Sequence, residues 1–441
     1  MNTRDFIDWA RQSQRLVEIA QQVDPYLEQA RVMSALDGRV VLFRNLAGLP
    51  SWRAVAGICA QREFFAQSLS CSVGQLVERI ADAVAHPCAP PRVPDGPCQQ
   101  QAQTPVDLMR LPIPRYHPAD GGRYVTAGIA VVGDPDYGRN VSIHRLMVLD
   151  HTHMVARLVE GRGAHTAWKK TTDDLPVAIA VGCPVHVLLA AAISPASGID
   201  EFGIAHALSP TPLVQCQTVD IAVPADAEMV LEGRITHRKA QEGPFPDLTG
   251  TMDVVRQQPI IEINRITHRA EPIFHAILPG GLEHRQLMGM PREPTILAAV
   301  NRVCRCTGVY ITPGGVSWLH AVVQIDKQTD DDGRNAIEAA FSGHSSLKHV
   351  VVVDQDVDIY SSDAVEWAIA TRFQADCDLV ILKDQSGSSL DPSAEKSPGQ
   401  KTRTAKMGLD ATAPLGSVRT EFERVGYAPV DLEQYGVNPT A

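Results

Sequence analysis

The middle of this chain is a succession of short β-rich segments, and this feature limits its fold more than any other. Valine, isoleucine and threonine gather in short runs that are separated by turn residues, as at Gly133-Asp134-Pro135-Asp136. The runs lie at residues 125–133, 140–149, 177–181, 214–223, 228–236, 260–269 and 273–278. Many short strands in succession, with few helices between them, predict a barrel-like β domain.

The segments on both sides of this region predict α/β structure. Upstream, apolar residues at helical spacing predict helices at 3–35, 51–61 and 72–85, with a short strand at 40–43. Downstream, the predicted helices 293–305, 334–341 and 363–372 alternate with the predicted strands 316–325, 349–353 and 379–382. The following stretch, 386–414, is rich in serine, glycine, lysine and threonine and predicts an irregular loop.

We therefore expect a mixed α/β (α+β) fold with three domains. Five prolines between residues 87 and 97 cannot continue a helix, so the first boundary is expected there or just after it. The expected domains are an N-terminal α/β domain at 1–105, a central β-rich domain at 106–292, and a C-terminal α/β domain with a tail at 293–441.

Composition excludes several classes of function. The net charge is −11 and aromatic residues make up 5%, which argues against a nucleic-acid binder and against a polybasic membrane anchor. Nine cysteines at irregular spacing do not indicate a disulfide framework. No basic stretch followed by an apolar run opens the chain, and the longest apolar run, 185–193, is too short to span a bilayer. We expect a cytoplasmic protein.

The first candidate for chemistry is an arginine inside an apolar strand. If residues 140–149 form a strand, Arg145 shares one face with Val141, Ile143 and Met147. A buried arginine needs carboxylate or phosphate partners, because an unpaired buried charge is costly. The alternative is a position at the strand end, from which the side chain reaches water.

The second candidate is the stretch Gln241-Glu242-Gly243-Pro244-Phe245-Pro246-Asp247. Its prolines and glycine predict a rigid, non-helical loop that carries two carboxylates, Glu242 and Asp247. Two acids close together raise the proton affinity of one of them, which suits a proton donor. A surface turn with solvated acids is the alternative, and the residues alone favour it.

Two further sets of residues are weaker candidates. Asn140, His165 and Glu201 offer oxygen and nitrogen donors that suit Mg²⁺ or Mn²⁺, but their spacing indicates no site. His284 and Arg292 lie at the expected junction of the central and C-terminal domains and could bind a carboxylate. The alternative, which the residues alone favour, is an interdomain linker with a helix start at Pro291.

Three stretches together give the chain a family resemblance: residues 140–145, residues 242–247, and Lys406-Met407-Gly408-Leu409-Asp410-Ala411-Thr412. In this order, and in a chain of this length, they resemble the UbiD family of prenylated-FMN-dependent decarboxylases. The resemblance runs from about residue 108 to residue 414. It implies that the central domain is a split-β-barrel-like flavin-binding domain and that the C-terminal domain mediates self-association, as a homodimer or a hexamer.

The resemblance also implies roles for individual residues. Arg145, Glu242 and Asp247 match the family's catalytic network, with Asp247 as the first choice for proton donor and Glu242 as the second. Asn140, His165 and Glu201 match the ligands of a divalent metal, Mn²⁺ or Mg²⁺, beside which K⁺ is usual. The residues expected to bind prenylated FMN are Asn140, Ser142, Ile143, His144, Arg145, Arg157, Leu158, Arg162, Gly163, His165 and Glu201.

The implied reaction is the reversible, non-oxidative decarboxylation of an aromatic or heteroaromatic acid through a covalent adduct with prenylated FMN. His284 and Arg292 resemble residues that hold a second carboxylate in the furan-2,5-dicarboxylate decarboxylase (HmfF-like) branch, so the expected reaction converts furan-2,5-dicarboxylate to 2-furoate. Pyrrole, indole and hydroxybenzoate carboxylates are alternative substrates. A flavin prenyltransferase is the implied cofactor supplier. A split-barrel flavin reductase and a non-catalytic flavin-binding subunit are the alternative classes.

Overall fold

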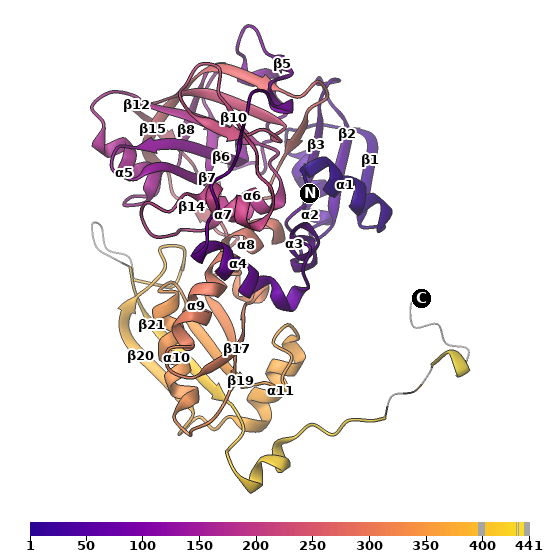
Figure 1. The fold of residues 1–441 in the computed structure, drawn as a ribbon, viewed down its shortest axis with the longest axis vertical. Coiled ribbons are helices and arrows are strands. Elements are labelled where there is room, and N and C mark those ends of the chain that lie inside the picture. The colour runs from indigo at the N-terminus through magenta and orange to yellow at the C-terminus, as the bar shows by residue number, and fades with distance from the viewer. Residues whose placement is uncertain (396–401, 429, 431, 436–441) are drawn as a thin grey trace.

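The computed structural model describes residues 1–395, 402–428, 430 and 432–435. The chain folds into a β-barrel, an α/β unit beside it that contains the N-terminus, and a second α/β unit below both (Figure 1). The three-part mixed fold expected from the sequence is confirmed. The boundaries at 105 and 292 stay a prediction.

The N-terminal unit is a four-stranded sheet in the order β1-β2-β3-β16. Its strands are β1 (Leu16–Val23), β2 (Val40–Leu46), β3 (Arg53–Ala56) and β16 (Ile273–His275). Its helices are α1 (Thr3–Gln12), α2 (Glu28–Ala35), α3 (Arg62–Leu69) and α4 (Leu76–Ala85). The strand β16 is contributed from a distant part of the sequence, so the chain returns to this sheet after completing the barrel.

Two helices predicted in this unit are wrong. Instead of one helix over 3–35, α1 ends and Gln14 adopts a left-handed conformation (φ 58°), after which β1 pairs in parallel with β2. Instead of a helix over 51–61, β3 leads to Gly57, which has φ 79° and a backbone so close to the Arg39 carbonyl that no side chain fits. In both places backbone pairing within the sheet outweighs the apolar spacing.

The centre of the molecule is a closed barrel of six strands. The order is β12-β9-β6-β7-β8-β15, and pairing of β12 with β15 closes it. The strands are β6 (Tyr124–Asp134), β7 (Gly138–Val148), β8 (His153–Ala156), β9 (Leu175–Val181), β12 (Met229–Glu242) and β15 (Arg256–His268). The helices α5 (Gly163–Lys170), α6 (Val185–Ala192) and α7 (Glu201–Leu208) are inserted between strands. The predicted strand 214–223 is two short strands, β10 (Leu213–Gln215) and β11 (Ala222–Pro224), paired antiparallel.

The C-terminal unit is a five-stranded sheet in the order β17-β18-β19-β21-β20. Its strands are β17 (Arg305–Ile311), β18 (His320–Asp326), β19 (His349–Asp354), β20 (Leu379–Ser386) and β21 (Arg403–Ala411). Its helices are α9 (Glu293–Val300), α10 (Asp332–Gly343) and α11 (Ser362–Arg372). Helix α9 ends five residues before the predicted end at 305, where β17 begins, and β17 was not predicted.

The irregular loop predicted over 386–414 is wrong for its second half. Strand β21 lies between β19 and β20 and pairs with both. Its sequence, Arg-Thr-Ala-Lys-Met-Gly-Leu-Asp-Ala, has polar residues at the buried position Lys406 and the half-buried position Asp410, so it lacks the alternation that marks a strand. Residues 396–401 of the same prediction lie outside the described part of the chain.

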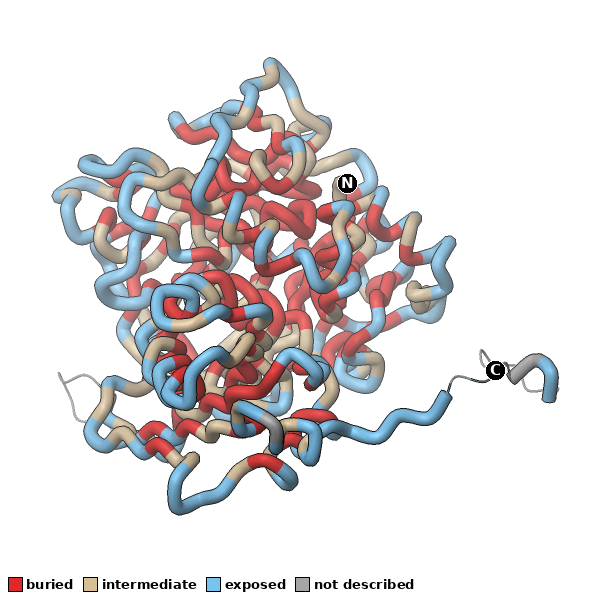
Figure 2. Tube along the Cα trace, turned by 60° about the horizontal axis from the view of Figure 1, so that its bottom comes forward, coloured by how far each residue is buried: buried red, intermediate tan, exposed pale blue. Residues whose placement is uncertain are grey.

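The three units are packed tightly against one another. Buried residues fill the interior of the molecule, whereas the loops at its periphery are exposed (Figure 2). One buried ion pair joins Arg62 of α3 to Glu293 of α9 at 2.8 Å, and Glu293 also accepts the backbone N–H of Ile311 at 3.0 Å. Helix α8 (Leu282–Gly289) leads into this junction. Among the described residues, no helix has the length and apolar character to cross a membrane.

Candidate active site

Arg145, in the middle of β7, is surrounded by three carboxylates. It donates two parallel hydrogen bonds to Glu242, from Nε to Oε1 at 2.9 Å and from Nη2 to Oε2 at 3.0 Å. It also donates to Asp247 Oδ2 at 3.1 Å and to Asp253 Oδ2 at 2.7 Å. Its guanidinium carbon lies 5.1 Å from the centre of the Phe245 ring. The arginine therefore holds both carboxylates expected from the sequence, and a third.

A tight hairpin puts the acids around this arginine. Strand β12 ends at Glu242, and β13 (Phe245–Pro246) pairs with β14 (Met252–Asp253). Asp247 follows β13 directly, and Asp253 closes β14 opposite Phe245. The sequence did not point to Asp253, because its place in the cluster depends on this pairing and not on any motif.

The two expected acids differ in exposure. Glu242 is fully buried, whereas the side chain of Asp247 is 19% exposed and also accepts the backbone N–H of Leu248 at 2.6 Å. Burial alone would lower the pKa of Arg145, but the hydrogen bonds and charges of Glu242 and Asp247 raise it. Arg145 is thus a fixed cation, and Asp247 is the more exposed of the two expected acids.

His284 lies beside this cluster at the start of α8. Its Nδ1 accepts the backbone N–H of Gly280 at 3.1 Å, so the proton of the neutral ring is on Nε2. Burial lowers the pKa of His284, and the charge of Asp247 opposes that shift only in part. The neutral imidazole can donate one hydrogen bond toward the cluster.

Asn140 and Glu201 form a second polar site, at the start of β7. Glu201, the first residue of α7, accepts from Asn140 Nδ2 and from the backbone N–H of Val141, both at 3.0 Å. Gly163, the first residue of α5, packs so closely on the Asn140 amide that a Cβ there would overlap it. His165 follows on α5, where its Nδ1 accepts the Gly161 N–H at 3.3 Å; no contact in the described structure joins it to Asn140 or Glu201.

This second site has the chemistry of a cation site. Glu201 is 4% exposed, both of its hydrogen bonds come from neutral N–H groups, and burial raises its pKa to about 7. A buried carboxylate of this kind gains from a nearby cation. Carboxylate, amide and imidazole donors fit Mg²⁺ or Mn²⁺. Within the described ranges no three histidine, cysteine or acidic side chains gather closely enough to hold a metal, so any site would include Asn140 or a ligand atom.

Other residues expected to bind the cofactor lie on β7 and directly after β8 (His153–Ala156). His144 Nδ1 donates to the Arg157 carbonyl at 3.0 Å, which leaves Nε2 to accept from the Ser142 hydroxyl at 2.9 Å. Burial lowers the pKa of His144, so the ring is neutral. Leu158 is buried and donates its N–H to Gln258 at 2.9 Å.

Two further expected cofactor residues differ in their surroundings. Ile143 packs on the barrel core, whereas Arg162 is exposed at the N-terminal end of α5. Their roles stay predictions.

His284 and Arg292 are not joined by any contact in the described residues. Arg292 lies in a 3-10 turn (Met290–Arg292) after α8, where its Nη2 donates to Ser194 Oγ at 2.9 Å. Its guanidinium carbon lies 5.8 Å from the Trp318 ring centre. The prediction that both residues hold one carboxylate remains untested.

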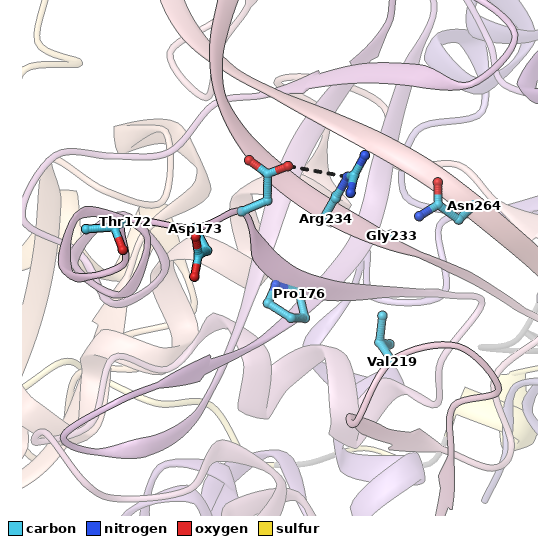
Figure 3. A pocket seen from close by; sticks show the side chains of 8 residues that line it. Thr172, Asp173, Pro176, Val219, Gly233, Arg234 and Asn264 are labelled. Carbon is cyan, nitrogen blue, oxygen red and sulfur yellow. Dashed lines mark ion pairs between the residues drawn. The ribbon is translucent and has the colours of Figure 1, made fainter.

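A shallow polar groove on the outside of the barrel is not part of either site (Figure 3). Thr172, Asp173, Pro176 and Arg234 are among the residues that line it, and Arg234 forms an ion pair with Asp174 at 3.3 Å. None of the residues expected to carry chemistry lines this groove.

Comparison with known proteins identifies the family. Residues 7–84, 91–282 and 285–411 match the N-terminal, Rift-related and C-terminal domain models of 3-octaprenyl-4-hydroxybenzoate carboxy-lyase. The chain is 41% identical over 432 residues to an anhydromevalonate phosphate decarboxylase of Methanothermobacter thermautotrophicus, covering 96% of this chain and 99% of that protein. It is 30% identical over 439 residues to a gallate decarboxylase of Lactiplantibacillus plantarum, covering 90% and 89%.

Solved structures agree with this result. The structure of the UbiD-class enzyme HmfF from Pelotomaculum thermopropionicum, in complex with FMN, has a TM-score of 0.94 and 37% identity, covering 98% of this chain and 99% of that one. An evolved dimeric form of HmfF in complex with prenylated FMN (prFMN) has a TM-score of 0.89 and 35% identity, covering 98% and 99%. The flavin reductase and the non-catalytic subunit are therefore set aside: the chain is a decarboxylase and belongs to the UbiD family of carboxy-lyases.

Proposed function

We propose that this decarboxylase uses prenylated FMN to remove carbon dioxide from an unsaturated acid, with Asp247 as the proton donor. The observation that carries the proposal is the cluster of Arg145 with Glu242 and Asp247, in which one acid is fully buried and the other remains accessible. The FMN and prFMN complexes of HmfF support the choice of cofactor.

Each residue of the cluster has a distinct task in the proposed mechanism. Bound prenylated FMN would supply the electron sink that an sp² carbon lacks. Arg145, fixed by Glu242, orients the substrate carboxylate and the Asp247 carboxyl group on one line. After carbon dioxide leaves, Asp247 gives its proton to the carbon that carried it. His284 donates its Nε2–H to the same end of the substrate.

We further propose that Asn140, Glu201 and His165 bind a divalent cation, Mn²⁺ or Mg²⁺, that would hold the cofactor phosphate. The buried carboxylate of Glu201, whose hydrogen bonds come from neutral N–H groups, supports this site. The family resemblance also leads us to expect a K⁺ ion beside the divalent cation.

Glu201→Gln is expected to remove the stabilisation of the protein by Mn²⁺, because the amide keeps the shape of the carboxylate but carries no charge. Melting temperature with and without Mn²⁺ would be compared in the wild type, in Glu201→Gln and in the control Glu366→Gln, which changes an exposed acid on α11. A clear Mn²⁺-dependent rise is expected in the wild type and the control only. The same rise in the melting temperature of Glu201→Gln would contradict the proposed cation site at Glu201.

Two substrates remain as candidates, and both carry a second anionic group. Furan-2,5-dicarboxylate is the substrate expected from the sequence, with 2-furoate as product. The similarity of about 40% over nearly the whole chain to several anhydromevalonate phosphate decarboxylases supports a phosphate-bearing acid instead. Pyrrole, indole and hydroxybenzoate carboxylates are weaker alternatives. Purified enzyme loaded with prenylated FMN would be assayed for carbon dioxide release from each acid, and release from none would contradict the proposal.

We propose separate places for His284 and Arg292: His284 at the reacting end of the substrate and Arg292 at the remote end. His284→Ala is then expected to lower kcat on monocarboxylates and on doubly anionic acids alike, by about 10- to 100-fold, as loss of a hydrogen bond made at the reacting centre does. A loss confined to doubly anionic acids would instead support the shared carboxylate site expected from the sequence.

The remaining expectations complete the proposal. They are the domain limits 1–105, 106–292 and 293–441, a cytoplasmic location, a flavin prenyltransferase as cofactor supplier, and a homodimer or hexamer. The evolved dimeric form of HmfF supports self-association in general.

A further inference from the structure

The first turn of α8, which carries His284, is held by a buried glutamate. Glu283 is 2% exposed, and its carboxylate accepts three hydrogen bonds from the N-terminal unit. Oε2 accepts the backbone N–H of Gly57 at 2.7 Å. Oε1 accepts the backbone N–H of Cys59 and the Nε2–H of His275, both at 3.0 Å. Because an ionised carboxylate can only accept, the His275 ring donates in this contact.

The donors come from well-fixed parts of the N-terminal sheet. Gly57 directly follows β3, has φ 79° and packs against the Arg39 carbonyl. His275 lies on β16, which pairs in parallel with β3. Asp37, between α2 and β2, accepts the backbone N–H of Leu282 through both carboxylate oxygens at 3.1 Å. The N-terminal unit therefore fixes the place at which α8 begins.

The same turn lies against the acid cluster. Gly280 has φ 70°, and a Cβ added to it would lie 3.1 Å from the backbone carbonyl oxygen of Asp247. Its N–H donates to His284 Nδ1 at 3.1 Å, so the imidazole is attached to the backbone that touches Asp247. A shift of this turn therefore moves His284 relative to the group that we propose as the proton donor.

We propose that Glu283 is a positioning residue that holds His284 at the reacting end of the substrate. The inference rests on the proposed function, in which His284 donates a hydrogen bond to that end. Successive residues of an α-helix are rotated by about 100°, so Glu283 can face the N-terminal sheet while His284 faces the acid cluster. A misplacement of about 1 Å can lower a rate by about 10²-fold, so the anchor matters although it is remote from the reacting atoms.

Glu283→Gln is expected to lower kcat by about 10- to 100-fold with little change in KM. Three N–H groups converge on the two oxygens of Glu283. Glutamine offers one oxygen, and its NH₂ group meets at least one of these donors, so the start of α8 has to shift. The measurement is carbon dioxide release by enzyme loaded with prenylated FMN.

Glu232→Gln is the matched control, because it removes the same kind of contact far from the site. Glu232 is fully buried and accepts the backbone N–H groups of Gln217 at 3.0 Å and of Thr218 at 2.6 Å, together with the Thr218 hydroxyl at 2.7 Å. It lies near the start of β12, roughly 30 Å along the strand from Glu242. A similar decrease in melting temperature is expected in both variants, but kcat of Glu232→Gln should stay close to that of the wild type. Equal kcat in the two variants would overturn the inference.

A double-mutant cycle shows whether Glu283 acts through His284. If it does, Glu283→Gln should cause no further decrease of kcat in a protein that already carries His284→Ala. Two independent roles would instead multiply the decreases of the single variants. A multiplied decrease would overturn the inference.

Hydrogen–deuterium exchange keeps the inference separate from the proposed function. Backbone exchange of residues 281–286 is expected to be faster in Glu283→Gln than in the wild type and in Glu232→Gln, because the first turn has lost its anchor. Unchanged exchange in folded Glu283→Gln would overturn the inference. Faster exchange combined with an unchanged kcat of His284→Ala would contradict the proposed role of His284 and leave the anchor standing.

His275 provides a second route if Glu283→Gln does not fold. Its Nδ1 has no hydrogen-bond partner within the described part of the chain, so His275→Leu loses only the contact with Glu283. This variant should show a decrease of kcat that is smaller than tenfold, since two of the three donors remain. His275→Gln, whose amide can donate in place of Nε2–H, should restore most of the activity. Wild-type kcat and exchange rates in His275→Leu would overturn the inference.

Discussion

Asp247→Asn is expected to stop turnover while the flavin stays bound, with kcat lower by a factor of about 10² to 10⁴, the usual contribution of a general acid. Asparagine keeps the size of the side chain but has no acidic proton to give. Asp247 is the most exposed acid of the cluster, with an exposed side-chain fraction of 19% against 14% for Asp253 and none for Glu242. The measurement is carbon dioxide release under single-turnover conditions, together with the absorbance spectrum of the bound flavin.

Asp253→Asn is the matched control for this variant. Asp253 also accepts a hydrogen bond from Arg145, at 2.7 Å, but it pairs with Arg256 as well. Burial favours its neutral form, yet the hydrogen bond from Arg256 and the charge of Arg145 outweigh burial and lower the pKa of Asp253. An acid held ionised is a poor proton donor, so Asp253→Asn should cost less than about tenfold. An equal decrease of kcat in the two variants, or an active Asp247→Asn enzyme, would show that Asp247 is not the proton donor.

Arg145→Leu is expected to destabilise the protein by about 3–5 kcal/mol and to abolish activity, because it leaves buried carboxylates without their cation. Glu242 is fully buried, and Arg145 is the arginine that pairs with it. In a barrel domain of this size the loss corresponds to roughly 10 °C in melting temperature. Thermal unfolding followed by circular dichroism would measure it.

Two variants show whether the loss comes from the unpaired carboxylate. Arg256→Leu removes an arginine that pairs with Asp253 alone and is 31% exposed, so it should cost about 1 kcal/mol or less. The double variant Arg145→Leu/Glu242→Leu removes the uncompensated charge and should be more stable than Arg145→Leu. Two results would contradict this reasoning: a melting temperature of Arg145→Leu equal to that of the wild type, or a double variant less stable than Arg145→Leu. Either would mean that the buried carboxylates do not require the charge of Arg145.

The sequence predicted the barrel because its strands carry strong, repeated β signals. The apolar neighbours of Arg145 left a paired arginine and a solvent-reaching one equally open, and only the family resemblance gave Glu242 and Asp247 as its partners. Sequence reasoning failed where pairing between distant segments decides the structure. Strand β1 forms because β2 lies beside it, although its apolar residues also fit a helix. Strand β21 is held between two neighbours, although it places Lys406 where an apolar residue would mark a strand.

The residues that sequence reasoning missed follow the same pattern. Asp253 reaches Arg145 only through the hairpin of β13 and β14. Arg292 and His344 reach the same side chain, Trp318, only when the C-terminal unit packs against the junction. The composition of residues 386–414 predicts a loop, because it does not show that β19 and β20 lie on either side of β21. Buried polar groups that break a local pattern were the best indicators of function in this chain.

The most direct test of the account is the mass and absorbance spectrum of the cofactor released from protein that is co-expressed with a flavin prenyltransferase. We expect a flavin mononucleotide that carries the additional prenyl-derived ring, bound in near-stoichiometric amount, and decarboxylation by the same preparation. Unmodified FMN, or no flavin in a correctly folded protein, would contradict the proposal that this carboxy-lyase works through prenylated FMN.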